Sequence, residues 1–128
     1  MHGDTLVLDT NAVIKLLDDN ANSEFLDSVF PDNVRAISVI TQIELLGYPG
    51  ITEEADELIR SFLDDIPIVS LDMPIVETTI QIRRDKPRLK LPDAIIAATA
   101  VVLDATLVTN DNDLLKLNFP RLHTISIA

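Results

Sequence analysis

The sequence predicts an α/β fold, namely a three-layer α/β/α sandwich built on a mainly parallel sheet of about five strands. Short apolar runs typical of strands alternate along the chain with amphipathic segments typical of helices. The first run, Leu6 to Leu8, is continuously apolar, as expected for a central strand that helices cover on both faces. The chain has no internal repeat, low-complexity segment or linker, so we expect residues 1–128 to form one domain.

The first half of the chain contains the first strand, one further predicted strand and several helices. In order, these are a helix over 12–17, a helix over 22–30, a strand within 35–40, a helix beginning at Thr41 and a helix over 53–63. Thr41 and Glu44 have the spacing of a capping box, in which the glutamate side chain returns to the first amide of the helix. Thr52 is expected to cap the helix over 53–63, whose inward face carries Ala55, Leu58, Ile59 and Phe62.

The second half repeats the alternation of strand and helix. Pro67 confines the strand over 66–69 to a sheet edge or to a strand start, since proline cannot donate a ladder hydrogen bond. Asp72 is expected to cap a helix that runs to about Arg84. The clearest helix covers 90–103, with Pro92 in its first turn and an apolar body. The remaining predicted elements are a strand over 105–108, a short helix over 114–116 and a strand over 122–127.

The charge of the chain is strongly acidic and unevenly distributed. The 21 acidic residues outnumber the 10 basic ones and give a formal net charge of −11. This balance disfavours nonspecific nucleic-acid binding by the surface as a whole and suggests a cationic partner or a bound metal. Half of the basic residues fall within eight positions and form a basic island, which consists of Arg83, Arg84, Lys86, Arg88 and Lys90. The island is either a phosphate-binding surface or a solvated loop that balances nearby acids.

Several residue types are absent or scarce, which excludes classes of chemistry. Cysteine is absent, so there are no disulfides or thiolate metal sites, and the chain fits a cytoplasmic location. We expect neither a signal peptide nor a membrane-spanning helix, because the N-terminus has no basic region and no apolar run is long enough. The three glycines form no phosphate-binding loop. His2 lies at the terminus and His123 in the last predicted strand, which disfavours an imidazole-driven ribonuclease.

Four carboxylates stand where strands are expected to end or helices to begin. These are Asp9, Glu44, Asp93 and Asp111, and Asp113 follows two residues after the last of them. Each has a local explanation, because Asp9 and Asp93 suit helix N-termini and Glu44 suits a capping box. In a parallel sheet, however, strand ends and the following helix starts share one edge, so we expect these acids to converge. Clustered carboxylates need a neutralising cation, and Mg²⁺ or Mn²⁺ prefers such oxygen ligands.

A carboxylate–metal centre suits the hydrolysis of a phosphodiester bond. The metal polarises a phosphoryl oxygen, activates a bound water and stabilises the leaving oxygen. The basic island lies immediately before Asp93, where it would hold the phosphate backbone of a nucleic acid that the rest of the surface repels. The sequence therefore predicts metal-dependent chemistry on a phosphodiester.

These motifs resemble those of the PIN domain family, and specifically its VapC-like toxin ribonucleases. The matching segments are 8–11 (LDTN), 38–45 (SVITQIEL), 91–100 (LPDAIIAATA) and 107–114 (LVTNDNDL), which span nearly the whole chain in the family's order. The resemblance implies a metal-dependent endoribonuclease that is the toxin of a type II toxin–antitoxin system. It also implies a homodimer, an RNA substrate and a cognate antitoxin. The chain departs from the family at Leu114, where phenylalanine is frequent, and this is a packing substitution.

The resemblance also implies roles for single residues. The acids expected to bind the metal and to be catalytic are Asp9, Glu44, Asp93 and Asp111. Asp113 matches a second acidic position of the last motif, so it is expected either to support Asp111 or to bind the metal itself. The polar neighbours expected to orient carboxylates or waters are Thr10, Asn11 and Thr109. The basic island is expected to bind RNA.

Two other classes of protein remain as alternatives. The first is a PIN-like domain that binds RNA or a protein partner without cleaving, although such a binder has no need to keep four carboxylates in a costly cluster. The second is a phosphatase that forms an aspartyl phosphate, which needs another acid two positions after its nucleophile, where Asn11 stands. The metal-dependent ribonuclease is the hypothesis that we favour.

Overall fold

The structure, a computed structural model, describes residues 5–127 of the chain. These residues form β1 (Thr5–Leu8), α1 (Thr10–Asp18), α2 (Asn20–Val29), β2 (Val34–Ser38), α3 (Val39–Leu46), α4 (Glu53–Asp64), β3 (Ile68–Val69), α5 (Met73–Asp85), α6 (Leu91–Leu103), β4 (Thr106–Val108), α7 (Asn112–Leu115) and β5 (His123–Ile125). The predicted alternation of strands and helices is confirmed. Among these residues, no helix is both long and apolar enough to cross a membrane.

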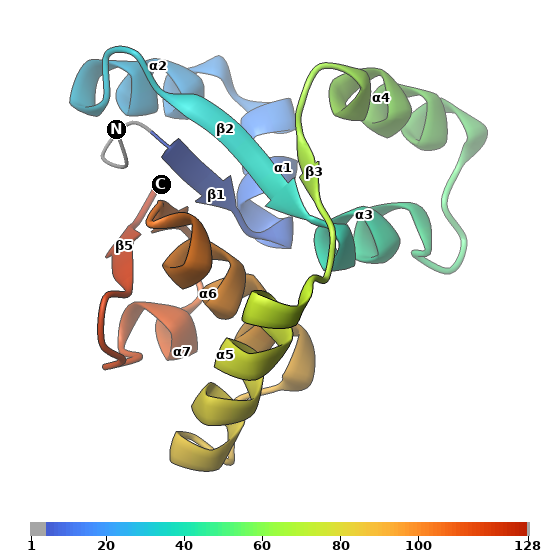
Figure 1. The fold of residues 1–128 in the computed structure, drawn as a ribbon. Helices are drawn as coiled ribbons and strands as arrows, with labels where there is room; N and C mark the ends of the chain where they lie inside the picture. The colour runs from blue at the N-terminus through green and yellow to red at the C-terminus, as the bar shows by residue number, and fades with distance from the viewer. Residues whose placement is uncertain (1–4, 128) are drawn as a thin grey trace.

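The strands form one five-stranded sheet in the order β3-β2-β1-β4-β5, and every pair of neighbours is parallel. β1 lies at the centre, where Val7 pairs with Ala36 of β2 and with Leu107 of β4. β3 is an edge strand, as Pro67 predicted, and the Pro67 carbonyl accepts a hydrogen bond from Ile37 N–H at 3.0 Å. The predicted α/β/α architecture is confirmed, and Figure 1 shows helices on both faces of the sheet.

Two hydrophobic cores lie on opposite faces of the sheet because successive side chains of a strand point in opposite directions. Val7 and Leu107 belong to the core that α5, α6 and α7 cover. Leu6, Leu8 and Val108 belong to the other core, which α1, α2, α3 and α4 cover. The central strands are therefore buried on both sides, as the continuous apolar run of β1 predicted.

The helices whose starts are marked by capping residues or proline have the predicted boundaries within one or two residues. The Thr52 hydroxyl caps α4 by accepting from Ala55 N–H at 3.1 Å, and the Asp72 carboxylate caps α5 by accepting from Ile75 N–H at 3.1 Å. α6 is buried without interruption from Ala94 to Val101, because its small residues pack closely on the sheet.

Three local predictions are wrong, namely the capping box, the start of the third helix at Thr41 and the inward position of Leu58. The capping box of Thr41 and Glu44 does not form, because β2 ends at Ser38 and α3 begins at Val39. The cap is the Ser38 hydroxyl, which accepts from Ile40 N–H at 3.1 Å, and Thr41 lies inside the helix. Leu58 does not face inward, since it is 56% exposed on the outer side of α4.

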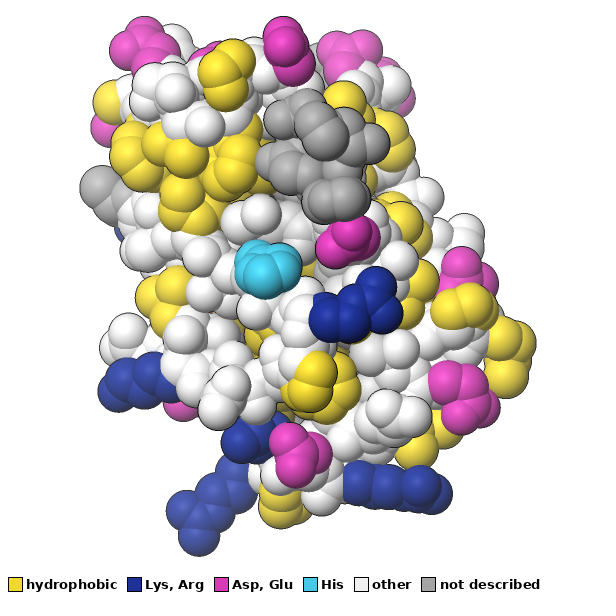
Figure 2. Space-filling model, turned by 60° about the vertical axis from the view of Figure 1, so that its left-hand side comes forward, with side chains coloured by type: hydrophobic (Ala, Val, Ile, Leu, Met, Phe, Trp, Pro, Cys, Tyr) yellow, Lys and Arg dark blue, Asp and Glu magenta, His cyan; other side chains and the backbone are white. Residues whose placement is uncertain are grey.

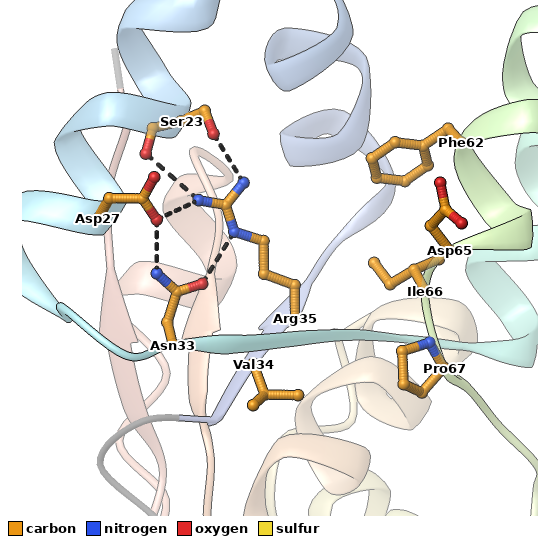
Figure 3. Close-up of a pocket in the computed structure, with 9 residues that line it drawn as sticks. All are labelled: Ser23, Asp27, Asn33, Val34, Arg35, Phe62, Asp65, Ile66 and Pro67. Carbon is orange, nitrogen blue, oxygen red and sulfur yellow. Dashed lines mark hydrogen bonds and ion pairs between the residues drawn. The ribbon is translucent and has the colours of Figure 1, made fainter.

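The cleft at the amino-terminal ends of β2 and β3 is a structural junction (Figure 3). There the Arg35 guanidinium donates to the Ser23 hydroxyl at 2.9 Å, to Asn33 Oδ1 at 2.9 Å and to Asp27 Oδ1 at 3.0 Å. Asp27 also pairs with the Arg35 charge. These contacts join α2 to β2 and engage the polar side chains on the α2 side of the cleft with one another.

Candidate active site

The carboxyl edge of the sheet has a topological switch point beside β1. The chain passes from β1 to β2 on one side, whereas β4 is added on the other side. In open parallel sheets, such a point leaves a crevice in which ligands bind. Asp9 follows β1 and Thr109 follows β4, so the ends of these two neighbouring strands deliver polar side chains to the same place.

Asp9 is only 4% exposed, and two hydrogen bonds fix its carboxylate in this buried position. Its Oδ1 accepts from Ala12 N–H at 2.7 Å, which makes it the N-cap of α1, and its Oδ2 accepts from the Thr109 hydroxyl. Burial raises the pKa of Asp9 above its ordinary value, the two hydrogen bonds oppose this rise, and the charges of Asp111 and Glu44 add to it. The capping role expected for Asp9 is thus present, and it holds the carboxylate next to other acids.

Thr109 joins the ends of β1 and β4. Its buried hydroxyl donates to Asp9 and accepts from Asp111 N–H at 3.0 Å. Asp111 in turn is the N-cap of α7, where its Oδ1 accepts from Asp113 N–H at 2.7 Å. The chain of contacts from Asp9 through Thr109 to Asp111 fixes the spacing of the first and last acidic motifs.

Glu44 reaches the same edge from α3. It is exposed, and its Oε1 accepts from the Thr10 hydroxyl at 2.6 Å, while Thr10 Oγ1 also lies 3.3 Å from Thr41 Oγ1. Thr10 directly follows Asp9 in the sequence, so this contact ties the second acidic motif to the first. Glu44 therefore faces the strand ends and not the first turn of its own helix.

Asp93 completes the group from the first turn of α6. Its pKa is raised to about 6, chiefly by burial, with further contributions from the charges of Asp111, Glu44 and Asp9; the charge of Lys90 acts in the opposite direction. The pKa values of Asp9 and Asp93 thus respond to the charges of Glu44 and Asp111, although the four residues come from four segments of the sequence. We call these four residues the acid cluster.

Two other residues of the predicted site lie outside the acid cluster. Asp113 is exposed on α7 and lines a groove with Lys86 and Lys116. Asn11 is exposed on α1 and lines a different groove. His123 is exposed in β5, and His2 lies outside the described residues.

The ligand types of the acid cluster suit a hard divalent cation, but the spacing of its side chains in this structure does not form a complete cation site. All four acids offer oxygen ligands, and their mutual repulsion would be relieved by a cation. Within residues 5–127, however, no three Asp, Glu or His side chains lie close enough together to hold one ion. Hydrogen bonds from Ala12, Thr109 and Thr10 orient both oxygens of Asp9 and Oε1 of Glu44, and each of these oxygens keeps a lone pair that could bind a cation.

The basic island divides between two surfaces. Arg83 and Arg84 line a cleft with Ile80 and Leu91, whereas Lys86 and Arg88 line the groove that contains Asp113. Lys90 is the N-cap residue of α6, and its charge lowers the pKa of Asp93. The island therefore does not form a single surface.

Sequence reasoning missed one cation of this region. Lys116 lies at the end of α7 and lines the same groove as Lys86 and Arg88. It stands alone in the sequence, many positions after the basic island, and no local pattern connects the two. Only the packing of α7 beside the loop between α5 and α6 brings them together.

A second groove opens beside Glu44 on the other side of the site. It has a volume of about 570 Å³ and lies between α1, α3 and α4. Its apolar lining includes the exposed side chains of Ile14 and Tyr48, and its polar lining includes Thr10, Asn11 and Glu44. An apolar surface thus leads directly to the acid cluster.

The fold and the site define an α/β protein with an acidic site at the carboxyl edge of a parallel sheet. The model of the PIN domain family matches residues 6–120, so the chain belongs to the PIN domain family. The resemblance found in the sequence motifs is confirmed. No curated protein matches the sequence significantly.

Several solved structures have a similar fold, among them a chain of a toxin–antitoxin complex. A chain of VapBC2 from Rickettsia felis, bound to a DNA fragment from its promoter, has a TM-score of 0.83 and 21% identity, with 97% of this chain and 99% of that chain covered. A chain of a toxin–antitoxin complex from Klebsiella pneumoniae has a TM-score of 0.74 and 28% identity, with 95% and 99% covered. A chain of FitAcB from Neisseria gonorrhoeae has a TM-score of 0.68 and 26% identity, with 83% and 87% covered.

Proposed function

We propose that this protein is a divalent-metal-dependent endoribonuclease and the toxin of a type II toxin–antitoxin pair, acting on RNA in the cytoplasm. The observation that carries the proposal is the acid cluster, in which Asp9, Glu44, Asp93 and Asp111 come from four segments and interact electrostatically at the switch point. Membership of the PIN domain family and the likeness to chains of toxin–antitoxin complexes support it.

The residues of the acid cluster would hold Mg²⁺ or Mn²⁺. When bound, such an ion polarises a phosphoryl oxygen and lowers the pKa of a coordinated water. The chain itself supplies position. Thr109 and Ala12 hold the Asp9 carboxylate, Thr10 holds Glu44, and the rigid first turn of α6 carries Asp93. Asp9, Asp93 and Asp111 stand at a strand end or a helix start and Glu44 stands in the body of α3, so packed secondary structure supports the position of each group.

The groove beside Glu44 supports an antitoxin as the protein partner. A partner segment with apolar side chains would bury Ile14 and Tyr48, and a cationic side chain at its end would meet Glu44. A homodimer is part of the same proposal. Ile80 and Leu91 are exposed apolar side chains that line one cleft, and they would lose that exposure against a second copy.

The test is cleavage of total RNA by the purified, partner-free protein with Mg²⁺ or Mn²⁺, repeated with excess chelator. We expect cleavage that requires the metal, is lost in Asp9→Asn and is retained in Asp32→Asn. Asparagine is as good an N-cap as aspartate, so the first variant keeps its fold. Asp32→Asn is the matched control, because it removes the same charge from an exposed turn.

Two results would count against the proposal. Cleavage that persists in the chelator or in Asp9→Asn would come from another site or from a contaminant. If the protein neither cleaves RNA nor binds metal, the acid cluster has another role and the chain is a PIN-like binding domain.

A further inference from the structure

The loop between α5 and α6 is a fixed turn and not a freely solvated segment. Leu89 N–H donates to the Lys86 carbonyl at 3.1 Å and closes the turn around Pro87. Arg83 Nη1 donates to the Leu89 carbonyl at 2.9 Å and holds the turn against the end of α5. Leu89 itself is buried in the same core as Leu114 of α7. Arg83 therefore has a structural role, and the turn presents Lys86 and Arg88 at defined positions.

The turn and α7 enclose a groove of about 220 Å³. Its lining residues are Lys86, Arg88, Leu89, Asp113, Lys116 and Leu117. Three cations thus surround one narrow space, and they come from two segments that the fold brings together. We call this space the basic groove.

Within the described part of the chain, no acidic side chain forms an ion pair with a cation of the basic groove. Among residues 5–127, the ion pairs join Arg35 to Asp27 and Arg60 to Asp56, and neither involves a residue of the groove. In a chain with a net charge of −11, three such side chains make this a local site of positive charge. Figure 2 shows this unevenness on one face, where Lys and Arg side chains gather towards one end and several acidic side chains lie along the other.

The basic groove lies beside the acid cluster, and the first turn of α7 links the two. Asp113 in its wall donates its backbone N–H to Asp111, and the charge of Asp111 raises the pKa of Asp93. A strand of nucleic acid whose scissile phosphate lies at the cluster therefore has three cations along the path past α7. A positively charged groove that tracks the backbone is the way in which proteins bind single-stranded nucleic acid, so the basic groove suits a single strand.

We propose that the backbone of single-stranded RNA lies in the basic groove, where Lys86, Arg88 and Lys116 bind its phosphates. In this arrangement, Asp113 lines the groove and is not a metal ligand. This inference rests on the proposed nuclease function. It adds Lys116 to the RNA-binding residues and removes Arg83 from them.

The experiment measures binding of a labelled single-stranded RNA oligonucleotide at several salt concentrations, in an Asp9→Asn background that prevents cleavage. Each lost phosphate contact lowers the salt slope by about 0.7 for a single strand. Lys116→Gln should therefore weaken binding about fivefold at 0.1 M salt. Arg60→Gln is the matched control, since it removes one cation from α4 and a surface ion pair of little energetic consequence. It should leave the affinity and the slope within error.

A second arm tests Asp113. Asp113→Asn removes a negative charge from the lining of the groove, so in the Asp9→Asn background it should tighten RNA binding, and in the otherwise wild-type protein it should leave the affinity for Mn²⁺ unchanged. A loss of Mn²⁺ affinity in Asp113→Asn would make Asp113 a ligand and overturn that part of the inference.

The outcomes separate the groove from the nuclease function. If the wild-type protein cleaves RNA but Lys116→Gln binds it like Arg60→Gln, the groove proposal is wrong and the nuclease proposal stands. If the wild-type protein neither binds nor cleaves RNA, both proposals are wrong.

Discussion

Asp9 is at once a structural and a candidate functional residue. Its carboxylate caps α1 through Ala12 and accepts from Thr109, and it does so in a buried position where ionisation is unfavourable. A buried carboxylate stabilises the junction of β1 and β4 only if hydrogen bonds compensate for the loss of its hydration. No local sequence pattern predicts the hydrogen bond between Thr109 and Asp9, because the two residues lie 100 positions apart in the chain.

Replacing Thr109 with valine tests this junction. The change conserves shape but removes the donor to Asp9 and the acceptor for Asp111 N–H, so we expect a loss of about 1–3 kcal/mol in the free energy of unfolding. Urea denaturation measures it. Thr99→Val is the control, because the buried Thr99 hydroxyl only returns to the Ile95 carbonyl of its own helix. Equal losses in the two variants would contradict a special role for Thr109.

Asp93 predicts a pH dependence of the metal-free protein. Its folded pKa of about 6 exceeds the ordinary value of 3.8, so the folded state binds the proton more tightly than the unfolded chain. Between these values, stability therefore falls as pH rises, and ionised Asp93 destabilises the metal-free protein above pH 6. Asp93→Asn should be more stable than the wild type at pH 7, and the difference should vanish below pH 4. Thermal unfolding across this range, in chelator, measures it, and a difference that does not change with pH would contradict the account.

At the scale of elements, the sequence predicted what is local and missed what depends on packing. α4, α5 and α6 were predicted nearly to the residue because Thr52, Asp72 and Pro92 mark their starts. α3 was placed too late, because Val39 and Ile40 suit a strand as well as a helix and Thr41 with Glu44 imitates a capping box. Contact with Thr10 decides where Glu44 points, and that contact is tertiary.

The start of α3 can be tested directly. Ser38→Ala removes the observed cap, so we expect the free energy of unfolding to fall by about 1 kcal/mol. Glu44→Gln should not lower stability in metal-free buffer, since it removes a charge that raises the pKa of Asp9 and Asp93. Chemical denaturation of both variants measures these effects. If Ser38→Ala were as stable as the wild type and Glu44→Gln were less stable, the result would favour a capping box of Thr41 and Glu44 over the Ser38 cap.

At the scale of the whole molecule, the parallel sheet brings together groups that the sequence keeps apart. The carboxylates could be predicted to converge because every strand end in a parallel sheet lies at one edge. The division of the basic island and the addition of Lys116 could not, because they depend on how α7 packs against the turn before α6. The net charge of −11 is likewise a property of the whole chain, and it opposes the compact state.

Cations should therefore stabilise the protein in two distinguishable ways. Monovalent salt screens the overall repulsion and should raise the melting temperature gradually. Mg²⁺ or Mn²⁺ at the same ionic strength should raise the melting temperature further. When the ion is at a hundred times its dissociation constant, its binding adds about 2.7 kcal/mol to the free energy of unfolding. Thermal melts at matched ionic strength compare the two. Identical melting temperatures in NaCl and in MgCl₂ would argue against a specific site.

The most direct test of the acid cluster is a calorimetric titration of Mn²⁺ into the wild-type protein and its variants. We predict one specific site whose affinity falls at least about tenfold in Asp9→Asn, Glu44→Gln, Asp93→Asn and Asp111→Asn alike, as for groups that hold or support a metal. Asp113→Asn and Asp32→Asn should bind as the wild type does. Wild-type affinity in Asp9→Asn or Asp93→Asn, or no specific binding in the wild type, would contradict the account.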